Sequence, residues 1–583
     1  MTKRQISTVL IIGFGLVSWL IISASPTSRA ELWYERSQIY LNAIRSGDLA
    51  QTYTQYHPGA TTMAVGGASL VALDVLPLPT ELLLPDNTTE PGIETAAIVW
   101  GQGLVMVGVM VGIAFTLRAL TDDVWLPVAA MGLMAFSPYL LSNIRSVHVD
   151  APVALYMALS ALLVLVYHQR RQWGWLAASG VAGGLALLTK SPAVFLFPYV
   201  GLVLLTLAVE EIMHMQERTV QGLLMTGWRV IVLPLLAWAG VAAVIFFVFF
   251  PAMWVSPLFV LGEIGDAILF HAETPHDNPY FFAGQIHDGE LGLVHYPVTI
   301  AFTLSAVVSG LIVIGVVLAL LPRTRRALPF HNVVYGLLWA YVIFFIIQMT
   351  ISAKTMPRYA LPAYPVLIVI AAAALLHGTR LIEKKVSERA AYAFLIVPLV
   401  LQMALAVVYH PELGTHTNHL LGGGRVAQNW IQLNDQNEGT MALVNYVHAH
   451  ASEDTVISLQ QPLRLTWVRF TQLEILLQEL GGDYVVLQHN MTVREHKVDE
   501  WGHWLDLLEG QDPAAAFVVD GVTYQWLYDV NDPPAETTIY RDGWEGFVPL
   551  SWLWFLGTLG VTGAAALQQK QAPATQPQMG QLS

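Results

Sequence analysis

Apolar residues gather along this chain in runs long enough to cross a bilayer, and charged residues fall mostly between the runs. A helix of about 20 residues spans the roughly 30 Å of hydrocarbon in a membrane. We therefore predict an all-helical membrane bundle of about twelve spans. Their ranges are 8–25, 96–117, 124–142, 150–167, 173–190, 192–209, 230–250, 297–321, 333–351, 359–377, 390–408 and 547–567.

Basic residues in the short connections predict the orientation of this bundle, because short loops rich in Lys and Arg stay in the cytoplasm. With the amino terminus inside, every short cytoplasmic connection carries at least one cation, and both termini are cytoplasmic. The cations that set this orientation are Lys3, Arg4, Arg118, Arg170, Arg171, Arg218, Arg229, Arg323, Arg325, Arg326, Arg380, Lys384, Lys385 and Arg389.

Three long segments then fall outside the membrane, at residues 26–95, 251–296 and 409–546. The first predicts an amphipathic helix from Leu32 to Ile44, followed by a turn and a helix of small residues that begins near His57. The chain divides accordingly into a membrane domain (1–408), a small outer α/β domain (409–546), a last membrane helix (547–567) and a disordered cytoplasmic tail (568–583).

The outer α/β domain is predicted from short strand patterns with helical patterns among them. The predicted strands are Thr455–Leu459, Tyr484–Gln488, Phe517–Val519 and Val522–Val530. The predicted helices are Met441–Ala449 and Gln472–Leu480.

Composition agrees with a protein that is mostly surrounded by lipid. Only 12% of the residues are charged, against about 25% in a soluble domain. The net charge of −14 argues against a nucleic-acid partner, because phosphate backbones bind basic surfaces. The chain has no cysteine, which excludes disulfides, thiolate metal sites and cysteine nucleophiles.

Ionisable residues cluster at the predicted outer ends of the spans. They are Arg145, His148 and Asp150 in one stretch, Lys190 in a second, and Lys354 with Arg358 in a third. A charge at the bilayer centre costs about 2.5–3.5 kcal/mol, so such residues either extend to the interface or serve a site. Cations from three separate stretches, beside carboxylates on one face, indicate a site.

Transfer of a sugar from a polyprenyl phosphate fits such a site. The lipid tail lies in the bilayer, so its phosphate lies at the interface, and Lys and Arg stabilise the charge that the leaving phosphate gains. The acceptor hydroxyl must lose a proton, which requires a base above the membrane plane. Two other classes stay open: a transporter, although its ionisable residues would be expected near the midplane, and a catalytically silent scaffold whose outer domain binds envelope partners.

Several short motifs, in order along most of the chain, resemble a known family. They are Arg36-Ser37, Gly47-Asp48, Thr52-Tyr53, the box from His57 to Met63, Arg145 to Asp150, Leu188 to Pro192, Pro357 to Pro365, Leu421 to Gly423 and Glu438-Gly439. On these motifs the chain resembles the bacterial relatives of the protein O-mannosyltransferases, which are family 39-like, GT-C type integral membrane glycosyltransferases.

The resemblance implies a GT-C fold, a dolichyl- or undecaprenyl-phosphate sugar as donor, and inversion at the anomeric carbon. By position, Lys190 and Arg358 would contact the donor phosphate, and we add Lys354 to them as a neighbouring cation. Arg145 and Asp150, with His148 beside them, would organise the cavity. The acceptor stays open between protein, lipid and glycan, and the short loops and the resemblance together predict a bacterial plasma membrane.

The sequence departs from the family where the catalytic base is expected. Relatives carry an acidic pair shortly before the Arg-Ser of the first outer loop, whereas the corresponding place here reads Arg29-Ala30, with Glu31 directly after. Glu31 would serve after a shift of one residue, and Glu35 is the second candidate. A third interpretation of this departure is that the chain has lost its catalytic activity.

Two histidine features complete the candidates. His57, in His-Pro-Gly, either starts the following helix through a turn or supports the site. The loop that contains His271, Glu273, His276, Asp277, His287 and Asp288 either binds a divalent metal or is a solvated loop over the cavity, and its spacing matches no defined ligand pattern. We therefore predict no metal and no cofactor besides the lipid-linked sugar.

Overall fold

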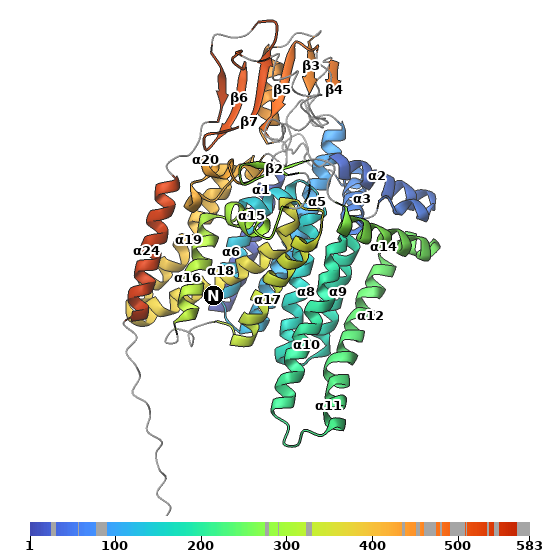
Figure 1. Ribbon diagram of the computed structural model, residues 1–583, viewed down its shortest axis with the longest axis vertical. Helices are drawn as coiled ribbons and strands as arrows, with labels where there is room; N and C mark the ends of the chain where they lie inside the picture. The colour runs from blue at the N-terminus through green and yellow to red at the C-terminus, as the bar shows by residue number, and fades with distance from the viewer. Residues whose placement is uncertain are drawn as a thin grey trace, which may run out of the picture.

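The computed structural model describes most of the chain. The described residues are 1–24, 31–55, 57–76, 90–274, 279–287, 289, 291–321, 329–433, 438–450, 455–459, 474–477, 481–489, 508, 510–532, 536–541 and 547–567. Helices form one long bundle, and a sheet lies at one end of it (Figure 1).

Each of the twelve predicted spans contains helix. Within the described residues, nine helical stretches are long and apolar enough to cross a membrane. They contain α1 (Lys3–Ser23), α5 (Glu90–Thr121), α8 (Asp150–Arg170), η2 with α10 (Ser191–Phe195, Leu196–Met213), α11 with η3 and α12 (Val220–Thr226, Gly227–Val232, Leu233–Val248), α17 (Asn332–Ile351), η5 with α18 (Pro357–Ala363, Tyr364–Lys385), α19 (Glu388–Tyr409) and α24 (Phe547–Leu567). The prediction of a multi-pass membrane protein is confirmed.

The other three predicted spans are irregular. Two are bent pairs: α6 (Leu126–Ala135) meets α7 (Pro138–Arg145) at 59°, and α15 (His295–Thr303) meets α16 (Ala306–Leu320) at 117°. Pro138 explains the first break, because proline cannot donate to the helix ladder and restricts the residue before it. The last is α9 (Trp173–Thr189), an apolar helix of 17 residues.

Burial divides the bundle into inner and outer helices. In α8 and α18 nearly every residue is buried, which is the pattern of a helix surrounded by other helices. In contrast, α1, α12 and α24 expose many of their apolar side chains. Such surfaces suit lipid tails, which are as apolar as the side chains themselves.

Close backbone packing joins α9 to α12. Gly180 and Gly184 lie four residues apart on α9 and face the main chain of α12. A Cβ atom at Gly180 would lie 2.9 Å from the Trp238 carbonyl oxygen, and one at Gly184 would lie 2.8 Å from that of Ala242. Small residues at this spacing let membrane helices approach closely. The packing fixes α9, whose end leads into Lys190.

Several short elements cover the end of the bundle nearest the sheet (Figure 1). They are α2 (Glu31–Ser46), η1 (Leu49–Thr52), α3 (Ala60–Val75), α13 (Ala252–Val255), α14 (Pro257–Glu273), the hairpin of β1 (Tyr280–Phe282) and β2 (Gln285–His287), and η6 (Leu413–Thr415), η7 (His419–Leu421) and α20 (Gly424–Ala427). The amphipathic helix predicted from Leu32 to Ile44 is confirmed as α2.

The sheet has six strands in the order β4-β3-β5-β7-β6-β8. They are β3 (Val456–Leu459), β4 (Glu474–Leu477), β5 (Tyr484–Gln488), β6 (Ala515–Val519), β7 (Val522–Asp529) and β8 (Thr538–Tyr540), and α21 (Thr440–His450) packs against β6 and β7. The four predicted strands and the helix at Met441–Ala449 are confirmed, as is the fold class of a helical bundle with a small α/β region.

The helix predicted at Gln472–Leu480 is wrong. Within that range, Glu474–Leu477 forms β4, which pairs in parallel with β3. A short apolar run of this kind satisfies helical and strand patterns equally well, and pairing with a neighbouring strand decides between them.

The sheet lies at the opposite end of the bundle from the start of α1 and the end of α24 (Figure 1). The turn between α10 and α11 also points away from the sheet. The Arg118 guanidinium near the end of α5 donates to the Thr8 hydroxyl in α1 at 3.0 Å, so the predicted cytoplasmic residue Arg118 lies beside the start of the first predicted span. Which side of the membrane each end faces stays a prediction.

The α9–α12 contact can be tested with a matched pair of glycine substitutions. Gly184→Ala places its Cβ 2.7 Å from that of Ile245, whereas Gly240→Ala on α12 meets nothing within 4 Å. We expect Gly184→Ala to cost about 1–3 kcal/mol through overpacking. Gly240→Ala should be neutral or stabilising, because alanine favours helix over glycine. Thermal unfolding in detergent measures both; equal midpoints would refute the close contact.

Candidate active site

Three residues from separate stretches converge on the buried carboxylate of Asp150. Lys190 Nζ lies 2.5 Å from Asp150 Oδ1, and Arg358 Nε lies 3.2 Å from Oδ2. His148 Nδ1 lies 2.7 Å from the same Oδ2. The side chains of Asp150 and Lys190 are 3% and 4% exposed, so the contacts are shielded from water.

Local structure explains why these side chains meet. Asp150 is the first residue of α8, where the helix dipole favours a carboxylate. Lys190 ends α9 in an extended conformation, directly before the Ser191-Pro192 turn. Arg358 belongs to η5, which packs against α8. The predicted grouping of Lys190, Arg358, His148 and Asp150 is therefore a feature of the structure.

A strained turn leads into this cluster. Val147 is buried and has φ 48°, an unusual value for a β-branched residue. Such strain persists only where the surroundings hold the backbone in place. Here it lies between α7 and α8, directly before His148.

The cluster carries a net positive charge. Lys190 and Arg358 supply two positive charges against the one negative charge of Asp150. Burial is the main cause that lowers the pKa of His148 to about 4, so this imidazole is neutral at pH 7. The net charge of the group is therefore +1, and an anion beside it would be stabilised.

A cavity of about 350 Å³ adjoins the cluster. Lys190 and Lys354 supply ammonium groups to its wall, and His57 and Ser191 add polar atoms. The aromatic ring of Tyr359 also lines it and lies under the Lys190 ammonium, with Nζ 4.2 Å from the ring centroid. This distance allows a cation–π interaction, which holds the ammonium at the cavity edge.

The cavity also has an apolar wall. Val194, Ile268, Met349 and Ile351 line it together with the cations. A pocket that combines apolar walls with a few charged groups is typical of a small-molecule or lipid site. An amphiphile with an anionic head matches both parts.

The His-Pro-Gly turn packs onto the Lys190 turn. The Gly59 N–H donates to the Thr189 carbonyl at 3.2 Å, and the Thr61 and Thr189 hydroxyls are 2.6 Å apart. His57 Nδ1 lies 3.5 Å from the Ser191 hydroxyl. Gly59 is also the left-handed residue before α3, so the turn both starts the helix and borders the cavity.

The two candidate bases both belong to α2. Glu31 is its first residue, and its side chain lies outside the described part of the structure. Glu35 follows one turn later and is exposed to solvent. Trp33, between them, is buried, and its ring lies 5.9 Å from that of His148. The start of α2 is therefore next to the Asp150 cluster, and the choice between the two acids stays a prediction.

Arg145 contacts the segment that follows α19. Its guanidinium donates to the Pro411 carbonyl of this segment. It also interacts with Glu412, whose pKa burial raises and this guanidinium lowers. Arg145 therefore connects α7 to the segment that joins α19 to the sheet.

Metal ligands do not gather in the described residues. No group of three or more His, Asp and Glu side chains there could hold a metal ion. His276, Asp277 and Asp288 of the acidic loop lie outside the described part, as does Arg29-Ala30.

Sequence reasoning missed the aromatic contacts of the site. Tyr359 holds the Lys190 ammonium, and Trp33 packs on His148. A signal for Tyr359 was present, because it follows Arg358 directly in the Arg-Tyr motif. No comparable pattern marks Trp33, since its partner is distant in the sequence.

Comparison with known proteins addresses one part of the chain directly. Residues 92–238 match the family described as dolichyl-phosphate-mannose-protein mannosyltransferase. The chain resembles these mannosyltransferases. The predicted resemblance is thereby confirmed, and the matching segment includes Asp150 and Lys190.

Solved structures give more distant likenesses. The ArnT of Cupriavidus metallidurans bound to undecaprenyl phosphate is 14% identical, with 90% of this chain and 99% of that chain covered and a TM-score of 0.44. The Archaeoglobus fulgidus oligosaccharyltransferase is 13% identical, with 78% and 62% covered and a TM-score of 0.41. At these scores neither likeness assigns an activity. No curated protein matches the chain.

Removal of the shared carboxylate should destabilise the protein. Asp150→Asn leaves Lys190 and Arg358 buried without their counter-charge, and loss of one partner of a buried pair costs about 3–5 kcal/mol. The control is Asp74→Asn, which removes the partner of Arg45 from an exposed pair, worth about 1 kcal/mol or less. Thermal unfolding measures both, and equal shifts would contradict a buried cluster.

The histidine of the cluster predicts a pH dependence. The pKa of His148 is lowered from 6.5 to about 4, so the unfolded chain binds this proton more readily than the folded chain. Stability should therefore fall as the pH drops from 6.5 toward 4, by at most about 3 kcal/mol from this residue. Unfolding midpoints of the protein and of His148→Gln across this range isolate the effect; parallel curves would show that His148 makes no contribution.

Proposed function

We propose that this protein is a membrane glycosyltransferase that moves a sugar from a polyprenyl-phosphate donor to an acceptor at the outer membrane face, with inversion. The observation that carries the proposal is the net-positive Asp150 cluster beside a cavity with both cationic and apolar walls. The match of residues 92–238 to a mannosyltransferase family supports the same class of reaction and of donor.

The donor phosphate would bind at the cationic wall of the cavity. Lys190 and Lys354 line this wall, and Arg358 contacts Asp150 behind it. Charge-assisted hydrogen bonds from such groups are about twice as strong as neutral ones. The first isoprene units would lie against Ile268, Met349 and Ile351. The lipid would thus enter between the helices from the bilayer.

Asp150 has a positioning role in this proposal. Its carboxylate contacts Lys190 at 2.5 Å and Arg358 at 3.2 Å, so it holds two cations from different helices at one place. A preorganised charge needs no rearrangement when negative charge develops in the reaction. Because Asp150 is already paired and buried, we do not assign it the role of base.

The reaction itself requires one bond to break and one to form. The bond between the anomeric carbon and the phosphate oxygen breaks, and its electron pair stays on the polyprenyl phosphate, next to Lys190 and Arg358. The acceptor oxygen attacks the opposite face of the same carbon, which inverts it. Its proton passes to a carboxylate, for which Glu31 at the start of α2 is the first candidate and Glu35 the second.

The acceptor class and the sugar are left open by this proposal, and hexosyl and pentosyl transfer are both included. The predicted location is the bacterial plasma membrane, with both termini in the cytoplasm. On that orientation, the cluster and the outer α/β domain share the outer side.

Turnover is tested by release of polyprenyl phosphate from a polyprenyl-phosphate sugar by the purified protein. We expect Lys190→Met and Arg358→Met each to lower the rate by about 10²–10³-fold, because each removes a group that stabilises the leaving phosphate. The control is Arg45→Gln, which removes a cation from an exposed ion pair on α2, the helix that carries the candidate bases. This variant should leave the rate unchanged.

The same assay assigns the base. Loss of release by about 10²–10⁴-fold in Glu31→Gln, but not in Glu35→Gln, would identify Glu31, and the reverse would identify Glu35. No release with any polyprenyl-phosphate sugar, from a folded protein, would contradict the proposal and favour a silent scaffold. Solute uptake into vesicles without release would favour a transporter.

A further inference from the structure

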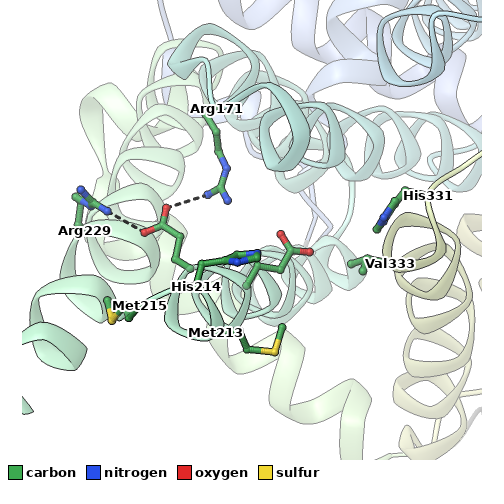
Figure 2. Close-up of a pocket in the computed structure, with 9 residues that line it drawn as sticks. Arg171, Met213, His214, Met215, Arg229, His331 and Val333 are labelled. Carbon is green, nitrogen blue, oxygen red and sulfur yellow. Dashed lines mark hydrogen bonds and ion pairs between the residues drawn. The ribbon is translucent and has the colours of Figure 1, made fainter. Parts of the chain in front are cut away.

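A second cavity lies at the opposite end of the bundle, far from the Asp150 cluster. It has a volume of about 700 Å³. Its walls come from the ends of α8 and α10, the start of α17 and the π-helical turn η3 before α12. Figure 2 shows Arg171, Arg229 and His331 around this space, on different helices. The proposed sugar transfer makes no use of it.

The cavity lies at the level where lipid headgroups are expected. Three membrane-spanning stretches begin or end beside it: one ends at Arg170, one ends at Met213 and one begins at Asn332. A fourth, Val220–Val248, contributes Arg229 from its π-helical turn. The ends of spanning helices mark the boundary between hydrocarbon and water. A ligand here would therefore meet the membrane interface, on the side away from the sheet (Figure 1).

Two guanidinium groups share one carboxylate in this cavity. Arg229 Nη2 lies 2.8 Å from Glu211 Oε2, and Arg171 Nη1 lies 3.6 Å from Glu211 Oε1 (Figure 2). The group of three carries a net charge of +1. Both arginines remain partly exposed, at 41% and 68%. They retain N–H donors in the planar arrangement that suits a phosphate.

A second carboxylate, that of Glu210, lines the same cavity, and among the described residues its one ion-pair partner is His168. Glu210 lies 3.7 Å from His168 Nε2, which is longer than a hydrogen bond. Its side chain is 33% exposed. With Glu210 included, the two arginines and two glutamates sum to zero, and a positive and a negative subsite lie in one space. A ligand with one phosphate and one ammonium group complements this pattern.

An apolar stripe leads from the cavity along α10. Met213 lines the cavity and is 60% exposed, and Val209 and Leu205 follow at intervals of four residues, at 46% and 48% exposed. Residues at this spacing lie on one helix face. An acyl chain attached to a headgroup in the cavity would have a continuous surface to follow into the bilayer.

We propose that this cavity binds the headgroup of an ethanolamine phospholipid. The phosphate would lie against Arg171 and Arg229, and the primary ammonium would donate to Glu210. A choline headgroup has the same phosphate but no N–H to donate, and a glycerol headgroup has no positive charge. The site should therefore prefer ethanolamine over both.

Native mass spectrometry of the full-length protein tests this site. The delipidated protein is mixed with equal amounts of phosphatidylethanolamine, phosphatidylcholine and phosphatidylglycerol, and the retained lipid is identified. We expect retention of phosphatidylethanolamine in excess. Arg171→Gln with Arg229→Gln should lower that retention by about tenfold, the scale of one charge-assisted contact. Glu210→Gln should abolish the preference over phosphatidylcholine and leave retention of both.

The control is Arg218→Gln, which removes an exposed cation of the neighbouring α10–α11 turn that does not line the cavity. It should retain the lipid as the unaltered protein does.

Equal retention of the three lipids, a preference for phosphatidylglycerol, or an equal loss in Arg218→Gln would each overturn the proposal. Soluble phosphoethanolamine should not displace the lipid; displacement at equal concentration would assign the site to a free phosphate compound. Because the readout is bound lipid, its failure leaves the sugar-transfer assay untouched.

Discussion

The buried ion pair between Lys190 and Asp150 is the interaction on which the candidate site depends. Two charges that are almost fully withdrawn from water require a close partner, since an unpaired buried charge is expensive. Asp150 provides that partner for Lys190 and also for Arg358. The group still has one positive charge in excess, which would stabilise an anionic ligand bound beside it.

The fold holds each member of this group from a different direction. The glycine face of α9 sets the position of Lys190 through its contact with α12. The His-Pro-Gly turn is bonded to Thr189, one residue earlier. Trp33 brings α2 against His148, so the helix that carries the candidate bases packs on the residues that hold the cations.

The sheet is attached to the bundle by buried and partly buried polar contacts. The Tyr409 hydroxyl at the end of α19 donates to the Asp520 carboxylate, and the Arg541 guanidinium donates to the Val408 carbonyl of the same helix. Arg145 bonds to Pro411 in the segment that joins α19 to the sheet. Because buried polar groups need partners, these contacts favour one position of the sheet over the bundle. Arg145 thus contributes to the joint between the two parts, and its supporting role in the site stays a prediction.

Sequence alone predicted the features of the fold and of the site that depend on local sequence patterns. Apolar runs identified the twelve helical segments, and cations at the span ends identified Lys190, Arg358 and Asp150 as neighbours. The bend between α15 and α16 and the strand β4 could not be predicted, because they depend on tertiary contacts that short windows do not contain. The partner of Arg145 lies 266 residues away. The contact of Trp33 with His148 also joins residues that are distant in the sequence, so no local sequence pattern predicts it.

The central claim is that the Asp150 cluster binds a lipid phosphate. The most direct test is an experimental structure of the protein in nanodiscs with a polyprenyl phosphate added. This account predicts the phosphate in the cavity beside Tyr359, within hydrogen-bond distance of the Lys190 ammonium, with the isoprenoid chain along Met349 and Ile351. A phosphate bound elsewhere, with this cavity empty, would contradict it.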